Sequence, residues 1–419
     1  MKELTVQVPY GNIHLEISLP EKNLMGIIEP QIVEEQREDE ISILRQAIEN
    51  PIGSPRLRDL ARSGQKVAIV TSDLTRPCPS AKMLPVILDE LSTAGIPDED
   101  IQIILGLGLH RPMSDVEIED TVSYNIRNRI QVINHDPNNT VHLGVTSFGT
   151  PVEFFRPVVE ADIRICLGNL EFHWFAGYSG GAKAILPGCA SKACVTANHG
   201  LMVRPGSASG HIEDNPLRMD IEEAVALLGV DFILNVVVDG NSRIIGAVAG
   251  ELTAAHRKGC EIVAVRGKVK VAKKADIVVA SAGGFPKDIN LYQAHKGLEN
   301  ARYFVREGGV IILAAECKEG IGNKTFESWI LSADSPAQVL IRIQNEFALG
   351  AHKAAAIASI VQKNPVLIVS NLTNEIARKA FLDPYLSIKD ALKDAFRRSG
   401  PESQVLILPH AGSIILDFT

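Results

Sequence analysis

The fold is decided by residues 65–108, which read QKVAIVTSDLTRPCPSAKMLPVILDELSTAGIPDEDIQIILGLG. The apolar runs at 65–73 and 100–108 have the length and composition of buried strands. Residues 81–96 between them have the period of a helix, with one apolar face formed by Leu84, Ile87, Leu88 and Leu91. A strand, a crossover helix and a second strand make a βαβ unit, which predicts a parallel sheet.

The same alternation of strands and helices extends over most of the chain. Further strands are expected at 161–170, 275–284, 365–372 and 403–412, a hairpin at 231–250 with its turn at residues 239–241, and helices at 251–265 and 290–309. We therefore expect an α/β fold of two α/β domains, with largely parallel sheets flanked by helices. The expected domains are residues 1–270 plus about 405–419, and residues 271–404.

Composition excludes several classes of protein. The chain has 419 residues, of which 46% are hydrophobic and 22% charged, as in ordinary globular proteins. Its 42 Lys and Arg residues against 50 Asp and Glu residues give a net charge of −8, which does not attract nucleic acid or anionic membranes. No segment reaches the roughly 18 uninterrupted apolar residues of a membrane helix, and the N-terminus lacks the apolar core of a signal peptide. We expect a cytoplasmic protein.

The cysteines and the helix patterns give little further information. The six cysteines are scattered without a CxxC pair, which speaks against a thioredoxin-like motif or a zinc knuckle. No heptad seam that would specify an oligomeric state is visible. Residues 114–117, which read SDVE, fit a capping box at the start of a helix.

Two polar clusters follow the strands of the first βαβ unit, where ligands of doubly wound sheets gather. Asp73 and Arg76 lie in SDLTRPCP (72–79), and Arg76 could clamp a carboxylate or phosphate. A local salt bridge between Asp73 and Arg76 that holds the turn explains the spacing alone slightly better. His110 in GLHRPM (108–113) could act as a general base, or it could be a structural histidine.

A longer polar stretch, HWFAGYSGGAKAILPGCASKACVTANH (173–199), sets His173, Lys183 and His199 around a glycine-rich turn. Glycines expose backbone N–H groups and can bind anions, but the spacing GxxxxGK[ST] of a Walker site is missing. A tight turn with a solvated lysine is the alternative. The cluster GGFPKDINLYQAHK (283–296) would place Tyr292, Gln293 and Lys296 on one face of a helix, as a solvent-facing helix also would.

Taken together, these motifs resemble those of the nickel-pincer-dependent lactate racemases and related 2-hydroxyacid racemases and epimerases. The matching segments are SDLTRPCP, GLHRPM, HWFAGYSGGAKAILPG (173–188), the following Asn198-His199-Gly200, and GGFPKDINLYQAHK. They occur in the order of the family and spread across most of the chain.

The resemblance implies a cofactor, nickel pyridinium-3,5-bisthiocarboxylic acid mononucleotide, the nickel-pincer nucleotide. By matching positions, Lys183 would attach it covalently, His199 would ligate Ni, and cofactor-synthesis proteins would supply it. Square-planar nickel accepts sulfur, carbon and imidazole donors of this kind. Further cofactor contacts are expected from Asp73, which could instead orient Arg76, and from Ser179, Gly180 and Gly181.

The resemblance also implies the chemistry and the remaining roles. Oxidation of a 2-hydroxyacid to a bound 2-ketoacid, by hydride transfer to the cofactor, avoids a carbanion beside a carboxylate. Two bases are needed for the two enantiomers, and His110 and His173 hold the matching positions. Substrate would be held by Arg76, Tyr292, Gln293 and Lys296, in a cleft between the domains.

Lactate is the expected substrate, and malate, phenyllactate and aldonates are alternatives, because every 2-hydroxyacid shares the groups that the motifs address. Two other classes of protein remain open. A nicotinamide-dependent dehydrogenase is disfavoured because no strand leads into GxGxxG, and LGLGLH has glycines at 106 and 108 alone. A non-catalytic hydroxyacid-binding protein is disfavoured because both histidines and the lysine are retained.

Overall fold

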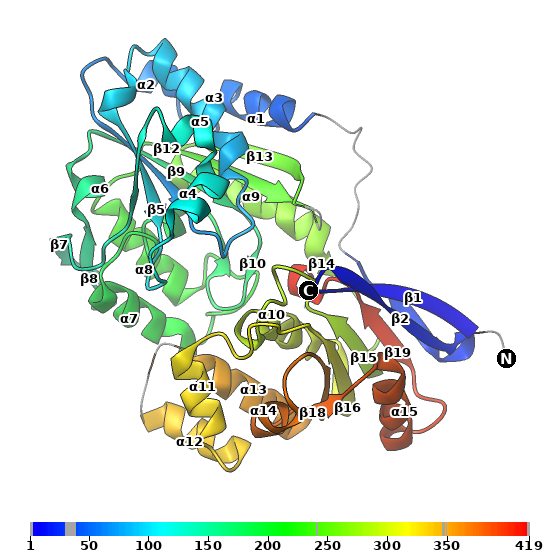
Figure 1. Cartoon of the computed structure of the whole chain (residues 1–419). Helices are drawn as coiled ribbons and strands as arrows, with labels where there is room; N and C mark the ends of the chain where they lie inside the picture. Colours follow the sequence, from blue (N-terminus) through cyan, green and yellow to red (C-terminus); the bar gives the residue numbers. More distant parts are fainter. Residues whose placement is uncertain (1–2, 30–38, 240–241, 346–347, 349, 417–419) are drawn as a thin grey trace. The chain divides into compact units, whose positions relative to one another are not determined.

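The computed structural model describes residues 3–29, 39–239, 242–345, 348 and 350–416 (Figure 1). The chain divides into two compact units. Residues 33–265 form one of them, here called the central unit, and residues 1–32 with 266–419 form the other, here called the terminal unit. In the described part of the chain, no helix combines the length and the apolar character needed to cross a membrane.

The central unit is built on a six-stranded sheet with the order β13-β12-β9-β4-β5-β6. All neighbouring strands in it are parallel except the hairpin pair β12 and β13. The strands are β4 (Val67–Ser72), β5 (Ile101–Gly106), β6 (Gln131–Asn134), β9 (Ile163–Asn169), β12 (Phe232–Val238) and β13 (Ile244–Gly250). The predicted βαβ unit is confirmed, and so is the hairpin, although Gly240 and Asn241 of its turn lie outside the described residues.

Helices and two small hairpins complete this unit. The helices are α1 (Glu40–Glu49), α2 (Leu57–Leu60), α3 (Ser80–Thr93), α4 (Asp115–Val122), α5 (Tyr124–Arg127), α6 (Arg156–Glu160), α7 (Lys192–Gly200), α8 (Pro216–Ala226) and α9 (Leu252–Gly267). The hairpins are β7 (Thr140–Val145) with β8 (Pro151–Phe155), and β10 (Phe172–His173) with β11 (Gly177–Tyr178). The expected capping box of Ser114 and Glu117 begins α4.

The terminal unit contains a second six-stranded sheet, which is parallel throughout, with the order β18-β17-β16-β15-β19-β3. Its strands are β3 (Leu24–Ile27), β15 (Ala275–Ser281), β16 (Val305–Ala314), β17 (Val366–Val369), β18 (Asp383–Tyr385) and β19 (Val405–Leu408). Alternate residues of β15 pack into two separate cores, Val278 and Ala280 into one, Ile277 and Val279 into the other.

Helices and a hairpin cover the two faces of this sheet. The helices are α10 (Leu291–Ala301), α11 (Lys324–Leu331), α12 (Pro336–Asn345), α13 (Ala351–Lys363), α14 (Asn374–Lys379) and α15 (Ile388–Ser399). Residues of α10, α11 and α13 join the first core, and residues of α15 join the second together with the hairpin of β1 (Glu3–Tyr10) and β2 (Ile13–Pro20). The short strands β14 (Lys268–Val269) and β20 (Ile415–Leu416) pair in parallel.

The units differ from the domain boundaries expected from the sequence. Strand β3, near the N-terminus, pairs with β19, which pairs with β15. Both ends of the chain thus belong with residues 266–404, and the expected assignment of residues 1–32 and 405–419 to the first domain needs correction. Short strands carry no local signal of their partner, because register and pairing are decided by the sheet they join.

The helix expected over 290–309 is shorter than predicted. It ends at Ala301, and Val305 already begins β16. Val305 pairs with Ala275 of β15. Phe304 is fully buried in the same core as Val278 and Ala280. The Gly308-Gly309 pair was expected to end a helix, but it lies inside β16. The β-branched residues of this segment favour a strand over a helix.

The buried side chains of the central strands should contribute strongly to the free energy of unfolding of the central unit. Ile103 of β5 is fully buried and packs in one core with Leu84 and Ile87 of α3. Ile103→Ala should lower the free energy of unfolding of the central unit by about 2–5 kcal/mol through lost burial and a cavity. The measurement is urea unfolding followed by tryptophan fluorescence. A Trp329→Phe background leaves Trp174 of the central unit as the reporter.

The matched control for this substitution is Val116→Ala, because the Val116 side chain is 70% exposed. It should change the free energy by no more than about 0.5 kcal/mol. Equal losses for the two variants would contradict the central position of β5.

Candidate active site

The polar residues singled out in the central unit follow adjacent parallel strands. Asp73 comes directly after β4, His110 lies in the loop after β5, and His173 follows β9. Because β4 lies between β9 and β5, these segments leave the sheet side by side at its carboxyl edge. The loops are also joined directly, since the Gly108 amide donates to the Gly188 carbonyl at 2.9 Å.

Asp73, which is buried, and His110, whose side chain is 46% exposed, form a carboxylate–imidazole pair. His110 Nδ1 lies 2.5 Å from Asp73 Oδ2, and Asp73 Oδ1 accepts from the amide and hydroxyl of Thr75. Burial alone would raise the pKa of Asp73, but the His110 hydrogen bond, the Thr75 hydroxyl and the Arg76 charge together lower it. An ionised carboxylate can only accept, so Nδ1 of His110 carries a proton and Nε2 is left to exchange one.

This pair is the main feature that sequence reasoning missed. Asp73 was expected to orient Arg76 or to contact a cofactor, whereas its hydrogen bonds go to His110 and Thr75. The signal was available in principle, because both residues end neighbouring strands of one predicted βαβ unit. Arg76 acts on Asp73 as a nearby charge.

Arg76 and Asp73 line a cavity of about 460 Å³ together with the first turn of α3 and residues Glu117 and Asp120 of α4. His110, His173, Lys183 and His199 are not among its lining residues. The cavity therefore borders the group of histidines and does not contain it. A guanidinium at its wall suits recognition of an anionic group.

The Phe175 ring brings together the three reactive side chains of the stretch 173–199. Its centroid lies 4.4 Å from that of His173 and 5.1 Å from that of His199, and Lys183 Nζ lies 5.6 Å from it. Phe175 is 4% exposed, and all three partners are buried. Residues that are 26 positions apart in the chain thus share one apolar neighbour.

The two candidate bases differ in their Nδ1 contacts. His173 Nδ1 accepts a hydrogen bond from the Ala176 amide at 3.3 Å. The neutral His173 ring in this arrangement carries its proton on Nε2, the opposite tautomer to the one that Asp73 imposes on His110.

His199 has the properties of a neutral ligand for a metal. Burial lowers the pKa of His199 to about 3, and the positive charges of Lys183 and Arg76 act in the same direction. A backbone contact with Val195, one turn earlier in α7, opposes this shift. Among the described residues, the buried Nδ1 has no hydrogen-bond partner of ordinary geometry. A neutral imidazole keeps a lone pair for a metal ion. In the described part of the chain, His, Cys, Asp and Glu form no group of three or more that could hold a metal.

The glycine-rich turn is shaped by close packing. Gly180 and Gly181 have φ angles of 72° and 56°, in the left-handed region that favours glycine. A Cβ at Gly180 would lie 2.6 Å from Asn235 Oδ1, and one at Gly181 would lie 2.6 Å from His256 Cδ2. The two glycines therefore let the turn approach β12 and α9.

The polar groups of this turn are bonded to the protein. Asn235 Oδ1 accepts from the Gly181 amide at 2.7 Å, and the Ser179 hydroxyl donates to the Asn169 carbonyl at 2.7 Å. Asn235 was not identified from the sequence. It could have been found as the single polar residue in an otherwise apolar strand, FILNVVV (232–238).

In the terminal unit, Tyr292, Gln293 and Lys296 lie on α10, as the sequence predicted. These three positions are partly exposed, whereas most of the helix is buried. Asn290 caps this helix by accepting from the Gln293 amide at 3.0 Å. Lys353 Nζ lies 3.5 Å from the centroid of the Tyr292 ring.

Comparison with known proteins identifies the family. The profile of the lactate racemase N-terminal domain matches residues 10–210, and that of the lactate racemase C-terminal domain matches residues 270–416. A lactate racemase of Thermoanaerobacterium thermosaccharolyticum is 35% identical, covering 98% of this chain and 99% of that protein. One of Lactiplantibacillus plantarum is 30% identical over 99% of this chain and 100% of that protein.

Solved structures agree with these sequence matches. The lactate racemase apoprotein of T. thermosaccharolyticum superposes with a TM-score of 0.92 at 34% identity, covering 99% of this chain and 100% of that one. A Thermotoga maritima protein with a TM-score of 0.71 at 20% identity, over 92% of this chain and 99% of that one, shares the fold. The resemblance inferred from the motifs is thus confirmed, and the chain belongs to the lactate racemase family.

Proposed function

We propose that this protein interconverts the two enantiomers of a 2-hydroxyacid, with lactate as its substrate. The observation that carries the proposal is the grouping of His173, Lys183 and His199 around Phe175, at the same sheet edge as the Asp73–His110 pair. Relatives that match over nearly their full length are lactate racemases. All six cysteines are free, which suits the reducing cytoplasm where we place this activity.

The proposed cofactor is the nickel-pincer nucleotide, and two buried residues suit it. Lys183 would attach it through its amine, and His199 would offer a neutral imidazole to nickel. Burial supports this role, because it keeps the His199 ring unprotonated with a lone pair for the metal. When bound, the cofactor supplies the acceptor for the hydride of the substrate. Ser179, Gly180 and Gly181 would contribute through the shape of their turn.

The acid–base roles fall to His110 and His173. His110 is prepared to take the hydroxyl proton at Nε2, because Asp73 keeps the other ring proton on Nδ1. For His173 to accept a proton at Nε2, its Nδ1 contact with the Ala176 amide has to open. Each histidine would serve the enantiomer whose hydroxyl faces it.

The substrate carboxylate would be held by fixed positive charge. Arg76 is half-buried beside the cavity that it lines, where water screens its charge less than at an open surface. Lys296, with Gln293 and Tyr292 on the same face of α10, would supply the second set of substrate contacts. Lactate, malate, phenyllactate and aldonates share the groups addressed here, so a panel of these acids decides the substrate.

Loaded wild-type protein should interconvert D- and L-lactate faster than the other acids of that panel, as followed by chiral chromatography. His110→Ala and His173→Ala should each lower kcat about 10²–10⁴-fold, the usual contribution of a positioned acid–base group, while nickel content is kept. His142→Ala is the control, because this histidine lies on β7 with a side chain 55% exposed. Near-normal activity of either catalytic variant would contradict the two-base mechanism.

Cofactor attachment can be measured without turnover. Lys183→Ala should abolish the mass adduct of the nucleotide in intact-protein mass spectrometry, whereas Lys192→Ala, an exposed lysine of α7, should retain it. His199→Ala should keep the adduct but lower the nickel content, because the imidazole ligand is lost. An adduct of unchanged yield on Lys183→Ala would rule out the assignment of this lysine.

Asp73→Asn tests the pair with His110. An amide can donate to Nδ1 and so favour the wrong tautomer. We expect kcat to fall by about 10²-fold or more, up to the ~10⁴-fold limit usual for acid–base catalysis. The lowered pKa of Asp73 adds a second readout. Its contribution to stability is present above the unfolded value of 3.8 and is lost as the pH falls through the lower folded value.

The variant should therefore lose less stability than the wild type when both are acidified from pH 5 to pH 2. Asp136→Asn, an exposed aspartate after β6, provides the control and should behave as the wild type does. Unchanged kcat and an unchanged acid profile in Asp73→Asn would contradict the role of the pair.

A further inference from the structure

Helix α8 carries two fully buried charged residues close together. Arg218 and Asp220 are both 0% exposed. Burial lowers the pKa of Arg218 to about 10, although the charge of Glu222 opposes this shift. Buried charges destabilise a fold unless they are bonded, so the groups that they bind indicate what they do.

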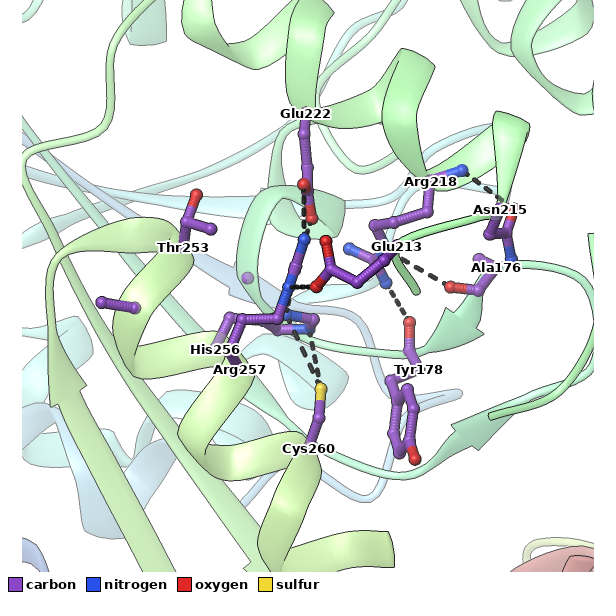
Figure 2. A network of polar contacts seen from close by, with 12 residues as sticks. Ala176, Tyr178, Glu213, Asn215, Arg218, Glu222, Thr253, His256, Arg257 and Cys260 are labelled. Atoms are coloured by element: carbon purple, nitrogen blue, oxygen red, sulfur yellow. Dashed lines mark hydrogen bonds and ion pairs between the residues drawn. The ribbon is translucent and has the colours of Figure 1, made fainter. Parts of the chain in front are cut away.

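Arg218 binds the loop that carries His173 and Lys183. Its Nε donates to the Ala176 carbonyl at 3.2 Å, and its Nη2 donates to the Tyr178 carbonyl (Figure 2). Two carbonyls on either side of Gly177 are thus held by one rigid guanidinium. A lysine could not reproduce this geometry, because its ammonium is a single point donor.

The N-cap residue of the same helix extends this contact. Asn215 Oδ1 accepts from the amides of Leu217 and Arg218, and Asn215 Nδ2 donates to the Phe175 carbonyl at 2.8 Å. Phe175 is the residue whose ring contacts His173, Lys183 and His199. The first turn of α8 therefore fixes the backbone from which this ring projects.

Asp220 binds a different element, the helix that carries His199. Its Oδ2 accepts from Asn198 Nδ2 at 2.7 Å and from the Thr150 hydroxyl at 2.8 Å, and its Oδ1 accepts from the Thr146 hydroxyl at 2.5 Å. Asn198 directly precedes His199 in α7. One helix thus holds both the loop of Lys183 and the helix of the candidate nickel ligand.

Helix α9 adds a further contact to the loop. His256 is buried with a pKa well below its ordinary value, because of burial and the charge of Arg218, so it is neutral. Its Nε2 donates to the Ser179 carbonyl at 2.9 Å. Beside it, Arg257 donates to Glu222, Glu213 and His256 (Figure 2). Among the described residues, none of its hydrogen bonds goes to the loop itself.

We propose that Arg218 and Asp220 of α8 and its N-cap residue Asn215 are positioning residues. They set the loop of His173 and Lys183 against the helix of His199 so that one cofactor can reach both. The proposal rests on the proposed function, because it assigns a purpose to this spacing. None of these three residues is proposed to contact the substrate. The structural step, that α8 holds the loop, can be measured on protein without cofactor.

The first experiment is hydrogen–deuterium exchange of the apoprotein. Arg218→Lys should speed exchange in residues 173–183 about tenfold or more, because bonds to a charged donor are lost and the loop opens locally. Arg257→Lys is the matched control, and its loop should exchange as in the wild-type protein. Asn215→Asp is a milder second variant, since aspartate caps helices equally well but cannot donate to the Phe175 carbonyl.

The second experiment measures cofactor attachment by intact mass. Arg218→Lys and Asn215→Asp should slow formation of the adduct on Lys183 about tenfold or more relative to Arg257→Lys. Asp220→Asn should instead lower nickel content and speed exchange in residues 192–200. The new side-chain NH₂ group cannot accept the hydrogen bonds that Asp220 Oδ2 accepts from Asn198 and Thr150.

The two proposals fail separately. Unchanged loop exchange in both Arg218→Lys and Asn215→Asp, or acceleration spread evenly over the central unit, would overturn the positioning role. Normal adduct formation and nickel content in all three α8 variants would overturn it too. Wild-type protein that loads the cofactor but racemises no 2-hydroxyacid would overturn the proposed function and leave the exchange result standing.

Discussion

The parallel pairing of β9, β4 and β5 is the constraint on which the rest of the site depends. Parallel strands end at the same edge, so residues that are 100 positions apart in the chain, as Asp73 and His173 are, follow strands at one edge of the sheet. The sheet interior is apolar, and Ile69, Ile103 and Ile165 are fully buried in one core. The loops add little regular structure of their own and are held by side chains from α8, α9 and β12.

Buried charge is concentrated around these loops. Lys183, Arg218 and His256 all lie beside one short turn, and two histidines of this region have lowered pKa values, because burial and neighbouring cations oppose protonation. Such an environment costs stability in the apoprotein. It also keeps the imidazole of His199 unprotonated and the loop backbone bonded, the two conditions that a metal and a covalent cofactor would require.

The pattern of strands and helices was predictable, and so was the position of the candidate residues at strand ends. Hydrophobic periodicity predicted β4, α3 and β5 within a few residues, because each element is long enough to show its period. The pairing of β3 with β19 was not predictable, since short strands carry no signal of their partner. Arg218 and Asp220 escaped notice for a similar reason: they bind backbone carbonyls and side chains distant in sequence, and no spacing rule reports such contacts.

The two candidate bases are unequal, and thermodynamics limits what this inequality can do. Asp73 prepares His110 to accept a proton at Nε2, whereas His173 must first release the Ala176 amide. Enantiomers have the same free energy in water, so kcat/KM has to be equal in the two directions of a racemisation. A readier base for one enantiomer can therefore change kcat in that direction only together with KM. The asymmetry of the site would appear in the separate constants and cancel in their ratio. Arg218 holds the carbonyl of the same Ala176 whose amide His173 would have to release, so the firmness of this loop would set how kcat and KM divide between the two directions.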